Sequence, residues 1–395
     1  MNNVNKSYKK QICNHLPSNF RLDLWQDGPL NRWAFQHVSD FLTTQDICAD
    51  HTCHRTRDPI INSIEDIDVS VDGGTLKLTK ILEDTQTDSI LVLRNGNVIY
   101  EKYFNGMTSD SKHLLQSISK SVLGVLYARM IDKGIIDPEQ QLGCYLPELN
   151  TCVFGSATVA QALDMRVALK FTEDYASPDS EITRLDRACG WKTNPTGEYP
   201  TLRSFLLSLT TRESDVTKLT VEHGSNFQYC SATTDVLAWL ITHVTGIPYS
   251  TLLERELWLP MGAHQNANIT VDSEGLAVGN GGISCTTIDL ALFGQLILRA
   301  GKAPGGEQVI PPSWIKQTYD GNQYKNHWWV NTNPNAPGIK EIHARGIYGQ
   351  YLWIDMETDT VIAKFSSDPV AKNSPKFGMH MALFRSISNW KPQFK

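Results

Sequence analysis

The stretch that decides the fold is Leu114-Leu115-Gln116-Ser117-Ile118-Ser119-Lys120-Ser121-Val122-Leu123. It places Ser117 and Lys120 three residues apart at the start of an apolar segment. That segment ends at Gly134, a residue typical of helix C-termini. Residues i and i+3 share one face of a helix, so the Ser117 hydroxyl and the Lys120 amine can meet. A serine is a weak nucleophile unless a base takes its proton, and a desolvated lysine is such a base. The pair indicates nucleophilic catalysis, with a capping serine beside an incidental lysine as the alternative.

The Ser-x-x-Lys pattern alone is not specific, because it recurs at Ser7/Lys10, Ser109/Lys112, Ser313/Lys316 and Ser388/Lys391. Three of these lie in a polar tail, in a loop and near the C-terminus, where fraying is common. Ser313 follows two prolines and is typical of a helix N-cap. Only Ser117 precedes a long apolar helix, which would desolvate its lysine.

Composition narrows the class of protein. A chain of 395 residues, 41% of them hydrophobic, can bury the cores of two packed domains. Its net charge of -6 gives no long-range attraction to nucleic acid or anionic lipid. No run approaches the roughly 18 apolar residues of a membrane span, and the N-terminus lacks the apolar region of a signal peptide. We therefore expect a cytoplasmic protein that binds neither nucleic acid nor membrane.

The eight cysteines do not require disulfides in a reducing compartment. Cys48, His51, Cys53 and His54 gather in one short segment, a pattern that invites a metal-site interpretation. No second ligand pair with structural-zinc spacing follows it. We therefore expect neither a metal nor another cofactor.

The order of the predicted elements indicates an α+β architecture. Two β-rich runs flank Asn95-Gly96 as a hairpin, and two more runs near the C-terminus precede a helix over 377–389. The middle of the chain is mostly helical or loop. We expect one antiparallel sheet flanked by helices, built from residues 1–155 and 285–395, with a mainly helical domain over 156–284 inserted and the active site in the cleft between them.

A third candidate residue is Tyr229, which comes just before a predicted helix over 233–244. A tyrosine at the mouth of a cleft can relay a proton to a leaving group. The alternative interpretation is a core aromatic residue with a solvated hydroxyl. The combination with Ser117 favours the relay.

Taken together, Ser117-x-x-Lys120, Tyr229-x-Ser231 and the run over 281–291 resemble the class C β-lactamase and family VIII esterase branch of the penicillin-recognising enzymes. The chain resembles the linear nylon-oligomer hydrolases, the 6-aminohexanoate-dimer hydrolases, more closely still. Further resembling segments are 22–26, 31–35, 173–175, 186–187, 227–239, 277–285, 349–350 and 352–353. The resemblance covers nearly the whole chain and implies a β-lactamase/transpeptidase-like fold.

The resemblance also implies roles in acyl transfer. Ser117 is the implied nucleophile, Lys120 the general base and Tyr229 the proton relay. The backbone N–H groups of Ser117 and Ile347 are the implied oxyanion hole. The implied substrate is a small amide or ester, and the implied assembly is a homodimer.

Three further residues are implied to bind substrate. Tyr175 would lie on a mobile loop that closes over the substrate and contacts the scissile amide, Asp186 would face the substrate's ammonium end, and Asn280 would line the same pocket. Two alternatives remain open: Asp186 can form a plain surface ion pair with Arg187, and Asn280 can serve the turn before Gly281-Gly282.

The third motif of the family departs from its usual form. Class C β-lactamases carry Lys-Thr-Gly on the strand that lines the cleft, whereas this chain reads Ala344-Arg345-Gly346-Ile347. The usual anchor for a β-lactam carboxylate is therefore missing. Arg345 is a substitute only if the strand register turns its side chain toward the cleft, and the sequence does not fix that register. The nylon-oligomer hydrolases read His-Gly-Gln where this chain has Tyr348-Gly349-Gln350.

Three functions follow, in order of preference. The first is hydrolysis of short linear amides of the aminohexanoate type. The second is a promiscuous family VIII-type carboxylesterase or a β-lactamase-like hydrolase. The third is a non-catalytic penicillin-binding-like module, which the presence of all three acyl-transfer side chains disfavours. A Ser-His-Asp hydrolase is disfavoured because the Gly-x-Ser-x-Gly elbow is absent.

Overall fold

The computed structural model describes residues 16–50, 62–213, 220–332 and 340–391. The candidate metal residues His51, Cys53 and His54 lie outside these ranges. Among the described residues, no group of three or more His, Cys, Asp or Glu side chains is placed to hold a metal ion.

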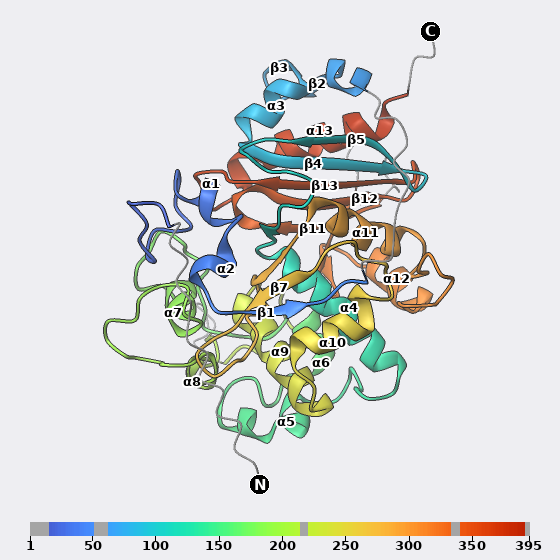
Figure 1. The fold of residues 1–395 in the computed structure, drawn as a ribbon. Helices are drawn as coiled ribbons and strands as arrows, with labels where there is room; N and C mark the ends of the chain where they lie inside the picture. The colour runs from blue at the N-terminus through green and yellow to red at the C-terminus, as the bar shows by residue number, and fades with distance from the viewer. Residues whose placement is uncertain (1–15, 51–61, 214–219, 333–339, 392–395) are drawn as a thin grey trace.

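A seven-stranded antiparallel sheet forms the centre of the upper half in Figure 1. Its strands, in spatial order, are β5 (Asn97–Tyr103), β4 (Thr87–Arg94), β13 (Thr360–Ser366), β12 (Gln350–Asp355), β11 (Lys340–Gly346), β10 (Trp328–Thr332) and β9 (Tyr324–Lys325). The predicted hairpin is confirmed, since β4 pairs with β5 and Arg94 faces Asn97 across the turn. Pairing of β4 with β13, with Val92 opposite Ile362, joins the two ends of the chain. The predicted antiparallel sheet built from both ends is therefore confirmed.

A second antiparallel sheet was not predicted. It contains, in spatial order, β1 (Thr44–Ile47), β7 (Ala267–Thr270), β8 (Ile283–Cys285) and β6 (His113–Leu114). These strands are two to four residues long, too short for a period of two to be recognised. The sheet takes strands from inside and outside the segment 156–284, and the predicted domain boundaries stay a prediction. A separate pair, β2 (Asp68–Val71) and β3 (Gly74–Lys77), completes the strands.

Helices cover both faces of the large sheet, and the lower half of the molecule contains further helices around the second sheet (Figure 1). They are α1 (Asn31–Ala34), α2 (Val38–Phe41), α3 (Leu78–Asp84), α4 (Ile118–Asp132), α5 (Leu142–Tyr145), α6 (Val159–Leu163), α7 (Glu181–Ala188), α8 (Leu202–Ser208), α9 (Ser231–Thr245), α10 (Tyr249–Leu253), α11 (Thr287–Leu298), α12 (Pro312–Tyr319) and α13 (Phe377–Asn389). Short 3₁₀ turns lie at Asn62–Asp66, Pro147–Thr151, Ile347–Gly349 and Ser374–Lys376, and a π turn lies at Glu254–Trp258.

Two hydrophobic cores hold these layers together. The smaller core packs α3 and α13 on one face of the large sheet, with Tyr351, Trp353 and Phe384 among its buried residues. The larger core lies on the other side and includes nearly the whole of α4 and α11. Because α4 is buried on all sides, its N-terminus is fixed below the sheet, where Ser117 begins it.

Among the described residues, no single helix has both the length and the apolar composition of a membrane span. Helix α9 and the segment Tyr249–Trp258, bent by 82° relative to each other, meet both criteria only when taken together.

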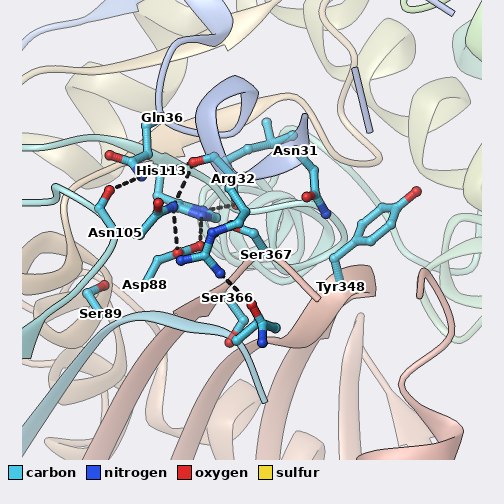
Figure 2. Close-up of polar contacts among 12 residues, drawn as sticks. Asn31, Arg32, Gln36, Asp88, Ser89, Asn105, His113, Tyr348, Ser366 and Ser367 are labelled. Atoms are coloured by element: carbon cyan, nitrogen blue, oxygen red, sulfur yellow. Dashed lines mark hydrogen bonds and ion pairs between the residues drawn. The ribbon is translucent and has the colours of Figure 1, made fainter. Parts of the chain in front are cut away.

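A buried polar network ties the sheet to the segment that leads into Ser117 (Figure 2). The Asp88 carboxylate on β4 is fully buried and accepts a hydrogen bond from Asn105 Nδ2 at 2.9 Å. It also contacts His113 Nε2 at 3.2 Å and the Ser367 hydroxyl. Because His113 lies on β6, four residues before Ser117, these bonds hold the start of the nucleophile segment against the large sheet.

Candidate active site

Ser117 and Lys120 meet at the N-terminus of α4. Ser117 is the residue that caps the helix, and Lys120 lies one turn further along, with 1% of its surface exposed. The Lys120 Nζ donates to Ser117 Oγ at 2.8 Å and to the Asn280 carbonyl oxygen at 2.7 Å. The predicted Ser117–Lys120 contact is therefore present, and the lysine is buried.

Asn280, whose carbonyl oxygen accepts from Lys120, is itself held by the buried carboxylate of Asp235. The Asn280 backbone N–H and its side-chain Nδ2 donate to Asp235 Oδ1 at 2.9 Å and Oδ2 at 2.7 Å. Asp235 lies on α9 and is fully buried, and burial raises its pKa to about 7, although the two hydrogen bonds from Asn280 act in the opposite direction. Asn280 thus gives its side chain to Asp235 and its carbonyl to Lys120.

The backbone around Ser117 is unusual in two ways. Gln116, directly before it, has φ of 50°, which a residue with a side chain rarely adopts. Gly346 at the end of β11 packs so tightly that a β-carbon there would lie 2.6 Å from the Leu115 carbonyl oxygen and 3.0 Å from the Ser117 nitrogen. Only glycine fits, and the next residue, Ile347, is thereby brought beside Ser117.

The loop after Gly346 is fixed by its own hydrogen bonds. The Tyr348 N–H donates to the Ala371 carbonyl at 3.0 Å, and the Gly349 N–H donates to Asn373 Oδ1 at 2.9 Å. Asn373 Nδ2 returns a bond to the Gly346 carbonyl at 2.7 Å. The Tyr348 and Gly349 amides are thus engaged elsewhere, which leaves the Ile347 amide as the candidate of this loop for an oxyanion at Ser117.

A cavity of about 430 Å³ opens beside the nucleophile, a volume typical of small-molecule sites. It brings together four of the predicted site residues: Ser117, Tyr175, Tyr229 and Ile347. The other residues that line it are Glu173, Trp329, Arg345, Gly346, Lys372, Asn373, Ser374 and Phe377. Asp186 and Asn280, predicted for the same pocket, do not line this cavity.

Tyr229 lies between Lys120 and an aromatic wall. Its ring stacks on Trp329 with 5.5 Å between centroids and meets Tyr324 edge-on at 5.9 Å. Lys120 Nζ lies 5.1 Å from the Tyr229 ring centroid. One stacked and one edge-on contact fix the plane of the ring beside the Ser117–Lys120 pair.

Glu173 connects the predicted substrate loop to the tyrosine segment. The Tyr175 hydroxyl donates to Glu173 Oε2 at 2.5 Å, and the Ser231 N–H donates to Glu173 Oε1 at 2.6 Å. Burial and the neighbouring Glu173 carboxylate raise the pKa of the Tyr175 hydroxyl well above its usual value. Neither the residue type nor the spacing of Glu173 predicts a role for it. Its only signal was its place in the resembling tripeptide 173–175.

Asp186 lies on α7 at the end of a chain of amides that starts beside the nucleophile. Gln116 Nε2 donates to Gln26 Oε1 at 3.2 Å, and Gln26 Nε2 donates to Asp186 Oδ2 at 3.3 Å. Burial raises the pKa of Asp186 to about 7. Asp186 is half-buried and accepts a hydrogen bond from Gln26, and its role in binding substrate stays a prediction.

Comparison with known proteins identifies relatives of the whole chain. A family model described as Beta-lactamase matches residues 78–377. The chain is 37% identical over 390 residues, 93% of each chain, to the 6-aminohexanoate-dimer hydrolase of Paenarthrobacter ureafaciens. A solved structure of a proposed 6-aminohexanoate-dimer hydrolase from Bacillus anthracis superimposes with a TM-score of 0.84 at 26% identity, over 94% of this chain and 96% of that one.

A more distant structure shares the fold alone. A family VIII carboxylesterase superimposes with a TM-score of 0.59 at 12% identity, over 78% of this chain and 95% of that one. The fold that the sequence resemblance implied is thereby confirmed.

Proposed function

This chain belongs to the beta-lactamase family, as a serine hydrolase of the 6-aminohexanoate-dimer hydrolase type, and we propose that it cleaves short linear amides through an acyl-enzyme on Ser117. The observation that carries the proposal is the 2.8 Å contact between Lys120 Nζ and Ser117 Oγ, at the edge of a cavity that Tyr229 also lines. The linear dimer of 6-aminohexanoate, which the Paenarthrobacter relative is named for, is the substrate we propose.

Acylation begins with proton transfer within the buried pair. Neutral Lys120 takes the Ser117 proton, and Oγ attacks the amide carbonyl carbon. The backbone N–H groups of Ser117 and Ile347 donate hydrogen bonds to the carbonyl oxygen as negative charge develops on it. Each such donor lowers the barrier by about 3 kcal/mol.

Collapse of the tetrahedral intermediate requires a proton on the departing nitrogen, because an amide anion is a poor leaving group. Tyr229 gives that proton to the amine and recovers one from Lys120. Water then attacks the Ser117 ester, passes its proton back through the same groups, and releases the acid and the free serine. Asp186 would bind the ammonium end of the acyl half, and Tyr175 would cover the scissile bond.

The second function that we propose is ester cleavage at the same serine. The leaving group of an ester is an alcohol or phenol. Its departure depends less on a proton from Tyr229 than the departure of an amine does. The fold shared with a family VIII carboxylesterase is compatible with this activity. A β-lactam is a weaker candidate, because Ala344 stands where class C β-lactamases carry their carboxylate-binding lysine.

Two expectations from the sequence, a cytoplasmic location and a homodimer, stay predictions. Light scattering coupled to size-exclusion chromatography tests the second. A mass near that of one chain would contradict it.

Release of free amine from the linear 6-aminohexanoate dimer tests the proposed function. We expect amine release by the wild-type protein and none by Ser117→Ala. Ser313→Ala is the matched control, since it removes the exposed serine of another Ser-x-x-Lys pattern and should leave the rate unchanged. No release by the wild-type protein would overturn the amide assignment, and a short-chain nitrophenyl ester would then test the esterase.

A further inference from the structure

Arg345 carries a positive charge into the catalytic cavity, and none of the described residues pairs with it as an acid. Its side chain extends from β11 and lines the same cavity as Ser117. The guanidinium lies 3.6 Å from the ring centre of Trp329 and 5.2 Å from that of Phe377. Within the described part of the chain, no carboxylate hydrogen-bonds to it, and the acidic groups that act on its charge are the hydroxyls of Tyr351, Tyr229 and Tyr324.

Burying a cation that no described carboxylate neutralises costs free energy, and an anionic ligand would offset that cost. Burial lowers the pKa of Arg345, yet a guanidinium stays charged at every physiological pH. Stacking on Trp329 satisfies the flat face of the guanidinium but not its N–H edge. That edge can bind a carboxylate through two parallel hydrogen bonds.

The other charges of the cavity do not neutralise Arg345. Lys372, an exposed residue on the rim, adds a second positive charge. Glu173 also lines the cavity, but its two oxygens accept hydrogen bonds from Tyr175 and Ser231. The wall that contains Arg345 is therefore positive and aromatic, which suits an anion at the end of an apolar chain.

We propose that Arg345 binds the carboxylate of the leaving half of the substrate, an ω-amino acid joined through its amine. This inference rests on the proposed function. When two ω-amino acids form an amide, the acyl half keeps the free amine and the leaving half keeps the free carboxylate. An anion site in the cavity of Ser117 thus selects for the leaving half, and the methylene chain of that half would pack on Phe377, which lines the same cavity.

Two substrates that differ only in charge test the proposal. They are the linear 6-aminohexanoate dimer and the same compound with its carboxylate converted to a carboxamide. We expect the wild-type protein to favour the carboxylate by about 10- to 100-fold in kcat/KM, mainly through KM, the range for hydrogen bonds to a charged group. Arg345→Met should abolish this preference, and Arg345→Lys, which keeps the charge but not the paired hydrogen bonds, should retain part of it. Arg255→Met, which removes an exposed arginine outside the cavity, should keep the full preference.

A binding measurement decides the question independently of turnover. Ser117→Ala protein, with and without Arg345→Met, is titrated calorimetrically with 6-acetamidohexanoate, which mimics the leaving half. At least tenfold weaker binding after Arg345→Met supports the site even if the amide assignment fails. Equal affinity, or equal kcat/KM of the wild-type protein for the two substrates, overturns the site and leaves the proposed function intact.

Discussion

Gly346 passes so close to Ser117 that a β-carbon on Gly346 would lie 3.0 Å from the Ser117 backbone nitrogen. One strand end is thereby set against the start of α4, and the amides of Ser117 and Ile347 are held as neighbours. The proposed oxyanion hole depends on this contact rather than on any side chain.

Gly346→Ala should therefore slow catalysis without unfolding the protein. The new methyl group would meet the Leu115 carbonyl oxygen, the Gln116 β-carbon and the Ser117 nitrogen, an overlap that costs about 1–3 kcal/mol of stability. Moving β11 outward also displaces the Ile347 amide, so we expect kcat on the dimer to fall at least about 100-fold. Gly378→Ala is the control, because a β-carbon there meets no atom within 4 Å. Wild-type kcat in Gly346→Ala would contradict the oxyanion assignment.

Tyr229→Phe should separate amide from ester cleavage. Because the amine needs a proton as it leaves, we expect amide hydrolysis to fall by about 10²- to 10⁴-fold. Hydrolysis of a nitrophenyl ester, whose leaving group needs no proton, should change less than about tenfold. The stacking on Trp329 does not require the hydroxyl, so the ring should keep its place. Equal losses on both substrates would remove the relay role from Tyr229.

Glu173→Gln should weaken substrate binding more than it slows the chemical step. The carboxylate holds Tyr175 and the Ser231 amide together, and a neutral amide can accept only through one oxygen. We expect KM for the dimer to rise about 3- to 30-fold, with a smaller change in kcat, since charge-assisted hydrogen bonds are worth about 1.5–3 kcal/mol. Glu139→Gln, at an exposed position, is the control. A kcat loss with unchanged KM would mean that Glu173 acts in the chemical step.

Asp186 should make substrate binding depend on pH. Burial raises its pKa to about 7, so the carboxyl is mostly neutral at pH 6 and mostly anionic at pH 8. If it binds the substrate ammonium, KM for the dimer should fall several-fold as the pH rises through 7. The N-acetylated dimer, which has no ammonium, should lack this dependence, and Asp186→Asn should abolish it for the dimer. The same pH profile in Asp186→Asn would refute the assignment.

The sequence predicts local features of this fold well. The helix that begins at Ser117 has a continuous apolar pattern, and the 95–96 hairpin has a strong turn signal, so both could be placed. The short strands β6 and β8 could not, because two or three residues carry no periodicity and pair only through tertiary contacts.

The same limit applies to the site. The Ser117–Lys120 contact lies within one helical turn, whereas the Asn280–Asp235 and Glu173–Ser231 contacts join segments far apart in the chain. No local pattern encodes such pairs. The side-chain direction of Arg345 could not be predicted for a related reason. Alternation along a strand shows which residues share a face of the sheet, but not which face meets the cavity.

The most direct test of the proposed mechanism is to locate the acyl group on the protein. Wild-type protein mixed with a short-chain nitrophenyl ester is quenched in acid within the first turnover, and its mass and peptides are measured. We predict a mass increase of one acyl group on the peptide that contains Ser117, and no increase in Ser117→Ala. An acyl group on any other residue, or an adduct that persists in Ser117→Ala, would contradict the assignment of Ser117 as the nucleophile.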